Sequence, residues 1–381
     1  MRLALYHPWI YLRSGLERTF VEVIQRSRHD WVWYTNYYRP ADTFPEVADL
    51  PVVELSRQIP PVRGPFRAVP TVAGLLTTRI PGDHDATLMS LSGLSDLALA
   101  RVHGPAVAYC HTPLKAIFDP ASRAAMRERK PLKHAVISSI GPAYAATNRL
   151  LWRRLDWVVA NSEETKSRII RGRLAGDDRI EVNHAGADLE RFTPGSPDRG
   201  TQLLAAGRIS WYKNLELAVD CTRELVAQGR VVELVIAGFL HASDQDYLKS
   251  LQSRAAGLPV RFVLGPTDDE LAELYRTSDL MLFTAINEDY GVAPLEAMAC
   301  GTPVVAVNSG GPRETVRHDT SGWLVSTDPV SFAAAVSAWQ DRTDKPDFRQ
   351  STRKHAEQFT WRRFVDRIDR AMEAAVSRRG G

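Results

Sequence analysis

Two carboxylates, Glu288 and Glu296, are separated by seven residues within the span Asn287–Val316. An apolar run precedes them and predicts a strand, so Glu288 falls in the loop that follows. Pro294 suits the first turn of a helix, where no amide hydrogen bond is lost, and Glu296 then lies inside that helix. Gly291 lies in the loop and allows the backbone to approach a ligand closely.

The start of this predicted helix is suited to binding an anion. The first N–H groups of a helix have no partner within it, and the positive end of the helix dipole points the same way. Carboxylates beside such amides accept hydrogen bonds from hydroxyl groups. The pattern therefore indicates a site that binds a phosphate and also forms hydrogen bonds with hydroxyl groups, as binding of a sugar nucleotide requires.

A group of basic residues follows the strand predicted at Leu203–Ala205. The loop Gly207–Asn214 carries Arg208, whose guanidinium can fork onto phosphate oxygens, and Lys213, a compact positive charge. Loops after parallel strands leave the carboxyl edge of the sheet, where open α/β folds bind ligands. A lysine at a helix start opposes the helix dipole, which favours a functional role over a plain surface charge.

In the first half, a histidine stands at the end of another apolar strand. The segment Tyr109–Pro113 reads Tyr-Cys-His-Thr-Pro and places His111 at the carboxyl edge of the sheet. A neutral imidazole can donate or accept a hydrogen bond and so orient a sugar hydroxyl. A lone histidine after a strand is more often structural, and the residues alone leave both roles open.

The span Asn287–Val316 resembles the glutamate–seven–glutamate motif of retaining, family-4-type glycosyltransferases of the GT-B fold (glycosyl transferases group 1). The run Glu-Ala-Met-Ala-Cys-Gly-Thr-Pro that begins at Glu296 makes the match specific. The resemblance implies that Glu296 binds the ribose hydroxyls of the donor and that Glu288 contacts hydroxyls of the transferred sugar. The other donor-binding residues that it implies are Gly15, Asp289, Tyr290, Gly291 and Val292.

The basic loop Gly207–Asn214 resembles the diphosphate clamp of the same family. Arg208 and Lys213 would then neutralise the charge that grows on the leaving diphosphate, and His111 would help orient the sugar. The implied reaction proceeds on one face of the sugar, and the leaving phosphate helps to take the acceptor proton. A double displacement with two carboxylates is not required.

Three shorter segments resemble the family less closely. Ser14-Gly15 stands where the family usually has two glycines, so the role of Ser14 is open. Asn308–Pro312 resembles the loop of mannosyltransferases that use lipid-linked acceptors, which favours mannose from a guanosine carrier over a uridine-linked hexose. Asn183–Asp188 resembles a segment near the family's hinge, and we assign it a structural role.

We expect no metal and no cofactor, with the nucleotide-diphosphate sugar acting as a substrate. Asp83-His84-Asp85 matches the Asp-x-Asp pattern that holds a metal in the other main glycosyltransferase fold. It follows Gly82 and precedes an apolar strand, so we interpret it as a turn, and Asp244–Asp246 as a helix start. The basic clamp and the helix dipole can replace a metal's charge.

Composition limits the class of protein. The chain has 381 residues, 44% of them apolar and 24% charged, which is ordinary for a globular protein with more than one core. Its net charge of +3 argues against a nucleic-acid partner. The three cysteines are scattered, and no secretion signal or membrane-spanning run is visible, so we expect a cytoplasmic protein with reduced thiols.

One short stretch is strongly basic. Arg123, Arg127, Arg129, Lys130 and Lys133 are opposed only by Glu128. A solvated basic helix is the default interpretation. Contact with an anionic membrane or with a phosphorylated lipid carrier is the alternative.

Alternating strands and helices predict an α/β protein with two Rossmann-like doubly wound domains that face a cleft, as in the GT-B fold. We expect an acceptor-side domain at 1–192, a donor-binding domain at 193–358 after a linker near Thr193–Asp198, and a helix at 359–381 that returns to the first domain. The stretch Pro40–Pro81 reads as irregular. The predicted strands are Leu3–Tyr6, Trp31–Tyr34, Ala86–Ser90, Val107–Cys110, Trp157–Ala160, Leu203–Ala205, Val231–Ala237, Val260–Leu264, Leu280–Thr284 and Pro303–Val307.

Three other functions fit these residues less well than a transferase does. An epimerase of similar fold would need acid and base groups and no acceptor, and the glutamate pair argues against it. A dinucleotide-dependent oxidoreductase would need a Gly-x-Gly-x-x-Gly after the first strand, which the chain lacks. A non-catalytic scaffold that binds sugar nucleotides is disfavoured by the intact glutamate pair and clamp.

Overall fold

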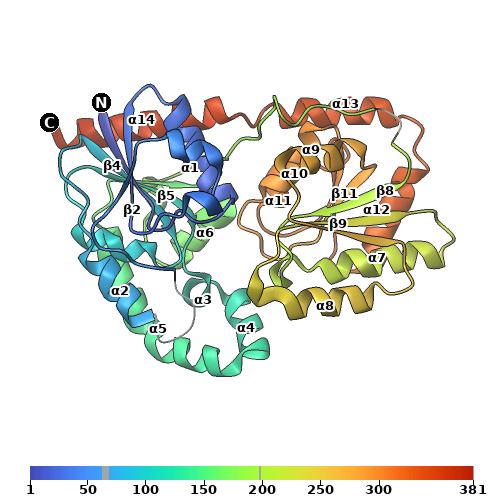
Figure 1. The fold of residues 1–381 in the computed structure, drawn as a ribbon, viewed down its shortest axis with the longest axis horizontal. Helices are drawn as coiled ribbons and strands as arrows, with labels where there is room; N and C mark the ends of the chain where they lie inside the picture. Colours follow the sequence, from blue (N-terminus) through green and yellow to red (C-terminus); the bar gives the residue numbers. More distant parts are fainter. Residues whose placement is uncertain (62–67, 197–198, 381) are drawn as a thin grey trace. The chain divides into compact units, whose positions relative to one another are not determined.

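The computed structural model describes residues 1–61, 68–196 and 199–380 (Figure 1). The chain divides into two compact units: unit 1 comprises Met1–Ala185 and Trp361–Gly381, and unit 2 comprises Gly186–Thr360. The first division falls within the segment Asn183–Asp188, ahead of the expected linker. Residues 193–196 of that linker belong to unit 2, and Pro197 and Asp198 lie outside the described residues.

Unit 1 is built on a seven-stranded parallel sheet in the order β3-β2-β1-β4-β5-β6-β7. The central strands are nearly continuous apolar runs, as expected for parallel strands covered on both faces, and Leu3, Ala4 and Leu5 are fully buried. The strands are β1 (Arg2–Tyr6), β2 (Asp30–Thr35), β3 (Val52–Glu54), β4 (Ala86–Ser92), β5 (Ala106–Thr112), β6 (Trp157–Ala160) and β7 (Ile180–Val182).

Helices cover both faces of this sheet, with α1 and α14 on one side and α2 and α5 on the other (Figure 1). Two of them begin at serine N-caps, where Ser14 and Ser162 accept hydrogen bonds from backbone amides of the first turn. The helices of the first segment are α1 (Gly15–Arg26), α2 (Ala68–Thr77), α3 (Lys115–Phe118), α4 (Pro120–Arg129), α5 (Pro131–Trp152) and α6 (Glu163–Arg171).

Unit 2 repeats the arrangement on a six-stranded parallel sheet in the order β10-β9-β8-β11-β12-β13. The strands are β8 (Gln202–Ala206), β9 (Glu233–Gly238), β10 (Val260–Leu264), β11 (Leu280–Phe283), β12 (Val304–Val307) and β13 (Gly322–Val325). The helices are α7 (Leu215–Ala227), α8 (Gln245–Arg254), α9 (Asp268–Thr277), α10 (Val292–Ala299), α11 (Pro312–Thr315), α12 (Pro329–Gln340) and α13 (Lys345–Ala356). Figure 1 shows α9, α10 and α13 on one side of the sheet and α7, α8 and α12 on the other.

The last helix, α14 (Trp361–Gly380), belongs to unit 1, which confirms the expected return of the chain. Its apolar side chains recur at helical spacing and are buried; among them are Phe364, Ile368 and Met372. Asp369 accepts a hydrogen bond of 2.6 Å from the hydroxyl of Ser27, at the end of α1. The tail is therefore fixed by both packing and polar contacts.

The expectation for Pro40–Pro81 was wrong in part. The stretch contains the strand β3 and the helix α2, although residues 62–67 lie outside the described residues. β3 has only three residues and lies at the sheet edge, so it carries little periodic signal. Pro70 falls in the first turn of α2, where proline is tolerated, so it does not break the helix.

Candidate functional site

The strand order of unit 2 brings two loops of the predicted site together. β8 and β11 are neighbours, and the order of the strands reverses between them. In open α/β sheets, ligands bind beyond the carboxyl ends of the strands at such a reversal. The loop after β8 carries Lys213, and the loop after β11 carries Glu288.

Lys213 and Glu288 form an ion pair. Nζ of Lys213 lies 2.5 Å from Oε2 of Glu288, and the two side chains are 23% and 22% exposed. The loop of Lys213 is fixed from the other strand, because the hydroxyl of Thr284 donates a 2.8 Å hydrogen bond to the Lys213 carbonyl oxygen. The ammonium also lies 5.4 Å from the centre of the Phe283 ring. The pair therefore places a cation and a carboxylate, both still reachable by solvent, at the strand ends.

Two glycines after β12 allow their loop to pack closely against the loop of Glu288. The amide of Gly311 donates a 3.0 Å hydrogen bond to the Glu288 carbonyl oxygen. A Cβ on Gly310 would overlap the backbone of Glu288, and one on Gly311 would overlap the backbone of Tyr290. The Gly310-Gly311 pair is thus explained by close packing, which removes much of its value as a sign of donor specificity.

The helix α10 begins beside Glu288, as expected. Gly291 precedes it with φ of 88°, a conformation that favours glycine, and Pro294 occupies its first turn. Asp289 and Val292 are partly exposed, whereas Tyr290 is only 4% exposed. Tyr290 is therefore buried, which argues against a contact of its side chain with the donor.

Glu296 lies on α10 and is oriented by a tyrosine that the sequence analysis missed. The hydroxyl of Tyr275, on α9, donates a 3.0 Å hydrogen bond to Oε2 of Glu296. Burial, with a further contribution from Glu296, raises the pKa of Tyr275 well above its ordinary value, so it remains a donor. A tyrosine on the inner face of an amphipathic helix reads as a core residue, so sequence offered no signal for this contact.

Arg208 shares the loop of Lys213 but is exposed, and its side chain forms no ion pair with another described residue. The structure thus brings together Lys213 and Glu288, and holds Arg208 nearby on the same loop. Asn214, which ends the loop, has φ of 48° and begins α7.

Unit 1 has a second group of polar side chains at the carboxyl ends of its strands β1 and β5. Burial, together with a smaller effect of the nearby His7, lowers the pKa of His111, at the end of β5, to about 3. His7 follows β1, and its Nδ1 lies 3.0 Å from the hydroxyl oxygen of Ser90 on β4. Burial likewise lowers the pKa of His7 to about 3. Both imidazoles are therefore neutral at ordinary pH.

The His111 ring is held by aromatic neighbours. Tyr109 and Phe20 meet it edge to face, at centroid distances of 4.7 and 5.6 Å. Its Nε2 is buried and has no hydrogen-bond partner within residues 1–61, 68–196 and 199–380. The signal for His7 was available in the sequence, since it directly follows the first strand.

Gly15 is the first residue of α1 and is exposed. Ser14 caps this helix: its hydroxyl oxygen accepts a 3.2 Å hydrogen bond from the Leu16 amide and its hydroxyl contacts the carboxylate of Glu17. Ser14 therefore has a local structural role.

Asp83-His84-Asp85 forms the turn before β4, as interpreted from the sequence. Both of its carboxylates contact Arg2: Asp83 forms an ion pair of 2.8 Å, and Asp85 accepts a 2.8 Å hydrogen bond from the backbone amide. The turn is thus tied to the start of β1.

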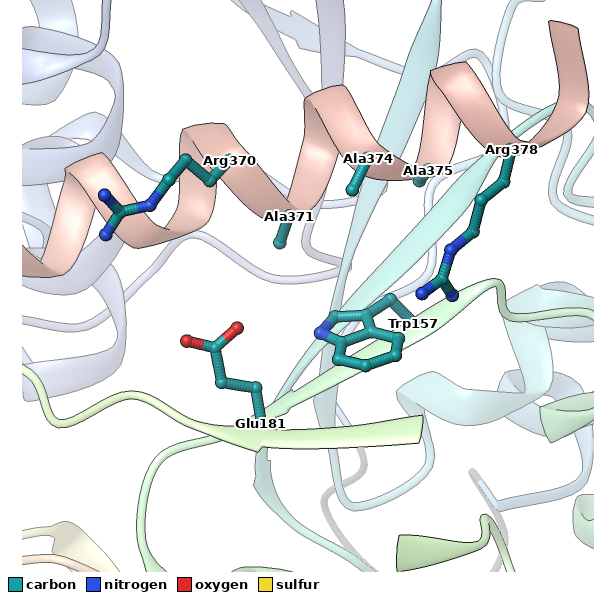
Figure 2. A pocket seen from close by; sticks show the side chains of 7 residues that line it. All are labelled: Trp157, Glu181, Arg370, Ala371, Ala374, Ala375 and Arg378. Atoms are coloured by element: carbon teal, nitrogen blue, oxygen red, sulfur yellow. The ribbon is translucent and has the colours of Figure 1, made fainter. Parts of the chain in front are cut away.

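A small cavity of about 220 Å³ lies at the edge of the unit 1 sheet, between α14 and β6–β7 (Figure 2). Trp157, Glu181, Arg370 and Arg378 line it with three alanines of α14. The Arg378 guanidinium lies over the Trp157 ring, 4.7 Å from its centre. The cavity contains none of the expected site residues.

Comparison with known proteins places unit 2 in a family. Residues 187–359 match the family model described as glycosyl transferases group 1. Unit 2 belongs to the glycosyl transferases group 1 family. The match includes both glutamates and the basic loop, and it confirms for unit 2 the family resemblance drawn from the glutamate motif.

Several curated relatives are named D-inositol 3-phosphate glycosyltransferase. A D-inositol 3-phosphate glycosyltransferase 1 of Catenulispora acidiphila is 29% identical over 95% of this chain and 91% of its own. A D-inositol 3-phosphate glycosyltransferase of Geodermatophilus obscurus is 33% identical over 58% of this chain and 53% of its own. Against most of the first such relatives, the chain spans little more than half of their length.

Solved structures confirm the GT-B fold of two parallel-sheet Rossmann-like domains. Sucrose-phosphate synthase of Thermosynechococcus elongatus has a TM-score of 0.78, with 17% identity and 99% of both chains covered. Anabaena HepE, solved with UDP and glucose, has a TM-score of 0.73, with 20% identity and 99% of both chains covered. At this identity the likeness concerns the fold alone.

Proposed function

We propose that this protein is a retaining glycosyltransferase that moves a hexose from a nucleoside-diphosphate donor to a hydroxyl acceptor. The ion pair of Lys213 and Glu288 at the strand reversal of unit 2 carries the proposal. It presents a cation for a diphosphate and a carboxylate for sugar hydroxyls in one place. The family of unit 2 supports the same class of reaction.

Each charged residue takes a separate part in this proposal. Glu296, oriented by Tyr275, accepts hydrogen bonds from the ribose hydroxyls. Glu288 does so from the transferred sugar, and Lys213 and Arg208 stabilise charge on the leaving diphosphate. The cation paired with Glu288 makes it a poor nucleophile, which favours a same-face displacement over a covalent intermediate on this carboxylate. No metal is required in this proposal, because the two cations and the start of α10 supply positive charge.

His111 supplies a neutral hydrogen-bonding group in unit 1. Its lowered pKa keeps the imidazole uncharged, and its buried Nε2 has no partner among the described residues. A sugar hydroxyl is a suitable partner for such a nitrogen.

The donor base, the sugar and the acceptor are the finer part of the proposal. Mannose on a guanosine carrier was favoured by Asn308–Pro312, but close packing explains the two glycines of that loop. HepE was solved with UDP, and the curated relatives are named for D-inositol 3-phosphate. GDP-mannose and UDP-linked hexoses are therefore the first donors to test, and a phosphorylated polyol is the first acceptor.

An acceptor-dependent assay tests the proposal. Each donor is incubated with and without D-inositol 3-phosphate or a lipid-linked glycan, and nucleoside diphosphate release and the anomeric configuration of the product are measured. We expect release that depends on the acceptor, with retained configuration. Release of diphosphate without any acceptor, or interconversion of the sugar nucleotide, would instead indicate a hydrolase or an epimerase.

A further inference from the structure

The outward side of α5 carries an exposed apolar stripe. Leu132, Val136 and Ile140 are 85%, 62% and 59% exposed, and Leu150 is 61% exposed. Leu132, Val136 and Ile140 follow one another at intervals of four residues, and Leu150 lies five full turns after Leu132. All four side chains therefore lie on one side of the helix. Figure 1 shows α5 along the lower edge of unit 1, with α4 beside its first turn.

The opposite side of α5 anchors the helix. Its buried residues are Gly141, Ala145, Asn148, Leu151 and Trp152. The side chains of Asn148 and Trp152 donate hydrogen bonds of 2.9 and 3.0 Å to the buried Asp96 carboxylate. The helix is thus held by one face, while the apolar stripe on the other is exposed among the described residues. Contiguous exposed apolar surface of this kind marks contact with a partner or a membrane.

Positive charge is concentrated on the same two helices. The segment 120–153 has seven lysines and arginines and one acidic residue, Glu128, a net charge of +6. The whole chain carries +3, so the remaining residues sum to −3. No aspartate or glutamate occurs in the α5 sequence.

Four of these cations have no side-chain partner among the described residues. Arg123, Arg127, Lys130 and Lys133 are exposed, and their side chains form no ion pair or hydrogen bond with another described residue. Other exposed arginines have carboxylate partners, as in the 2.6 Å pair of Arg28 with Glu373. These four side chains are therefore available to an external anion.

We propose that α4 and α5 form a surface that docks on an anionic lipid bilayer. The stripe of α5 enters the boundary between headgroups and acyl chains, and the free cations of α4 and of the first turn of α5 meet lipid phosphates. A helix with apolar side chains on one face and nearby lysine and arginine binds such interfaces without spanning them. None of the helices in the described residues is long and apolar enough to cross a membrane. The inference does not depend on the proposed transferase activity.

Other occupants fit the surface less well. A second copy of the chain on the same patch would bring two segments of +6 together, which is unfavourable. A nucleic acid would use the cations but would leave the stripe of Leu132, Val136 and Ile140 unexplained. An anionic bilayer satisfies both features at once.

Sedimentation with vesicles tests the inference. The full chain is mixed with vesicles of phosphatidylcholine alone or with 30% phosphatidylglycerol, at low and high salt. We expect binding to the anionic vesicles that weakens with salt. Replacing three cations (Arg127→Gln, Lys130→Gln, Lys133→Gln) should lower the partition coefficient on the order of 100-fold, at roughly fivefold for each cation. Replacing the stripe (L132S, V136S, I140S) should lower it at least roughly tenfold.

A matched control changes the same charge elsewhere. Arg79→Gln, Arg101→Gln and Lys354→Gln remove three exposed cations outside α4 and α5, and this variant should bind vesicles like the wild type. Circular dichroism confirms that each variant is folded. The inference would be overturned if the wild type bound neutral vesicles as well as anionic ones, or bound no anionic vesicles. It would also be overturned if the control variant lost as much binding as the α4–α5 charge variant. A dimer that the stripe variant abolishes while vesicle binding is unchanged would overturn it too.

Discussion

The two units share a strand order but differ in the chemistry at its reversal. In unit 1 the order reverses between β1 and β4, and in unit 2 between β8 and β11. Unit 2 has a charged pair at this position, Lys213 and Glu288. Unit 1 has His7 after β1 and, two strands along at the end of β5, His111; the pKa values of both imidazoles are lowered to about 3.

The comparison separates what topology decides from what residues decide. Topology brings the loops of neighbouring strands to one edge, whatever their sequence. The residues at the strand ends then decide whether that edge presents charge or neutral hydrogen-bonding groups. Our proposal accordingly assigns the diphosphate and the charged contacts with hydroxyls to unit 2, and it adds His111 of unit 1 as a neutral partner for a sugar hydroxyl.

The largest effect is expected for Glu288→Ala. The proposal gives this carboxylate a contact with the transferred sugar, so kcat should fall roughly 100-fold, or about 3 kcal/mol. Diphosphate binding should be unchanged or tighter, because Lys213 is released from its ion pair. Steady-state kinetics and calorimetry measure the two effects separately. Unchanged turnover would contradict the assignment of Glu288.

Lys213→Ala should weaken nucleoside-diphosphate binding roughly 10- to 100-fold, because a charge-assisted contact is lost. The variant also leaves Glu288 without its cation. The double variant Lys213→Ala/Glu288→Gln removes that complication and should bind diphosphate as weakly as the single variant. If the double variant bound like the wild type, like-charge repulsion from Glu288 would explain the loss, and the lysine would have no phosphate role.

Unit 1 should lose stability in acid because of its histidines. The unfolded pKa is about 6.5, so below that pH the unfolded chain binds protons that the buried neutral rings do not. The contribution of each neutral histidine to the free energy of unfolding is therefore fully present above pH 6.5. It is lost as the pH falls towards 3. The loss at pH 5 should be about 2 kcal/mol for each histidine.

Urea unfolding at pH 7 and pH 5 measures this loss. His111→Gln, which cannot titrate, should reduce the difference between the two pH values by about 2 kcal/mol. Replacement of the exposed His103 by glutamine is the control for loss of a histidine elsewhere in unit 1. An unchanged difference in His111→Gln would show that the ring of His111 is not kept neutral by burial.

Tyr275→Phe should have the smallest effect, a loss of roughly three- to tenfold in diphosphate affinity, because one hydrogen bond to Glu296 disappears. A role in orienting Glu296 towards ribose predicts something more specific. The preference for a ribonucleoside diphosphate over its 2′-deoxy form should also fall in the variant. Equal weakening for both nucleotides would instead indicate a general structural role for Tyr275.

The sequence was sufficient for the regular part of the fold. The parallel strands Trp157–Ala160 and Val260–Leu264 have the bounds that their apolar runs predicted. The helix around Pro294 and the loop of Glu288 also followed from local chemistry. These features depend on residues that are close together in the sequence, so they could be predicted from one sequence.

Contacts between distant residues were beyond the sequence. The pairing of Lys213 with Glu288 joins residues 75 positions apart, and that of Tyr275 with Glu296 depends on how α9 packs beside α10. The short edge strand β3 was missed because three residues show no periodicity. The packing role of Gly310 likewise became visible only when the Glu288 backbone lay against it.

Calorimetric titration with GDP, UDP, ADP and dTDP in the presence of a chelator tests the central claim most directly. The account predicts that one diphosphate binds clearly more tightly than the others, and that binding survives the chelator because Lys213 and Arg208 supply the positive charge. Adding acceptor should not be needed for this binding. No binding of any diphosphate with or without acceptor, or binding only when a divalent metal is restored, would contradict the account.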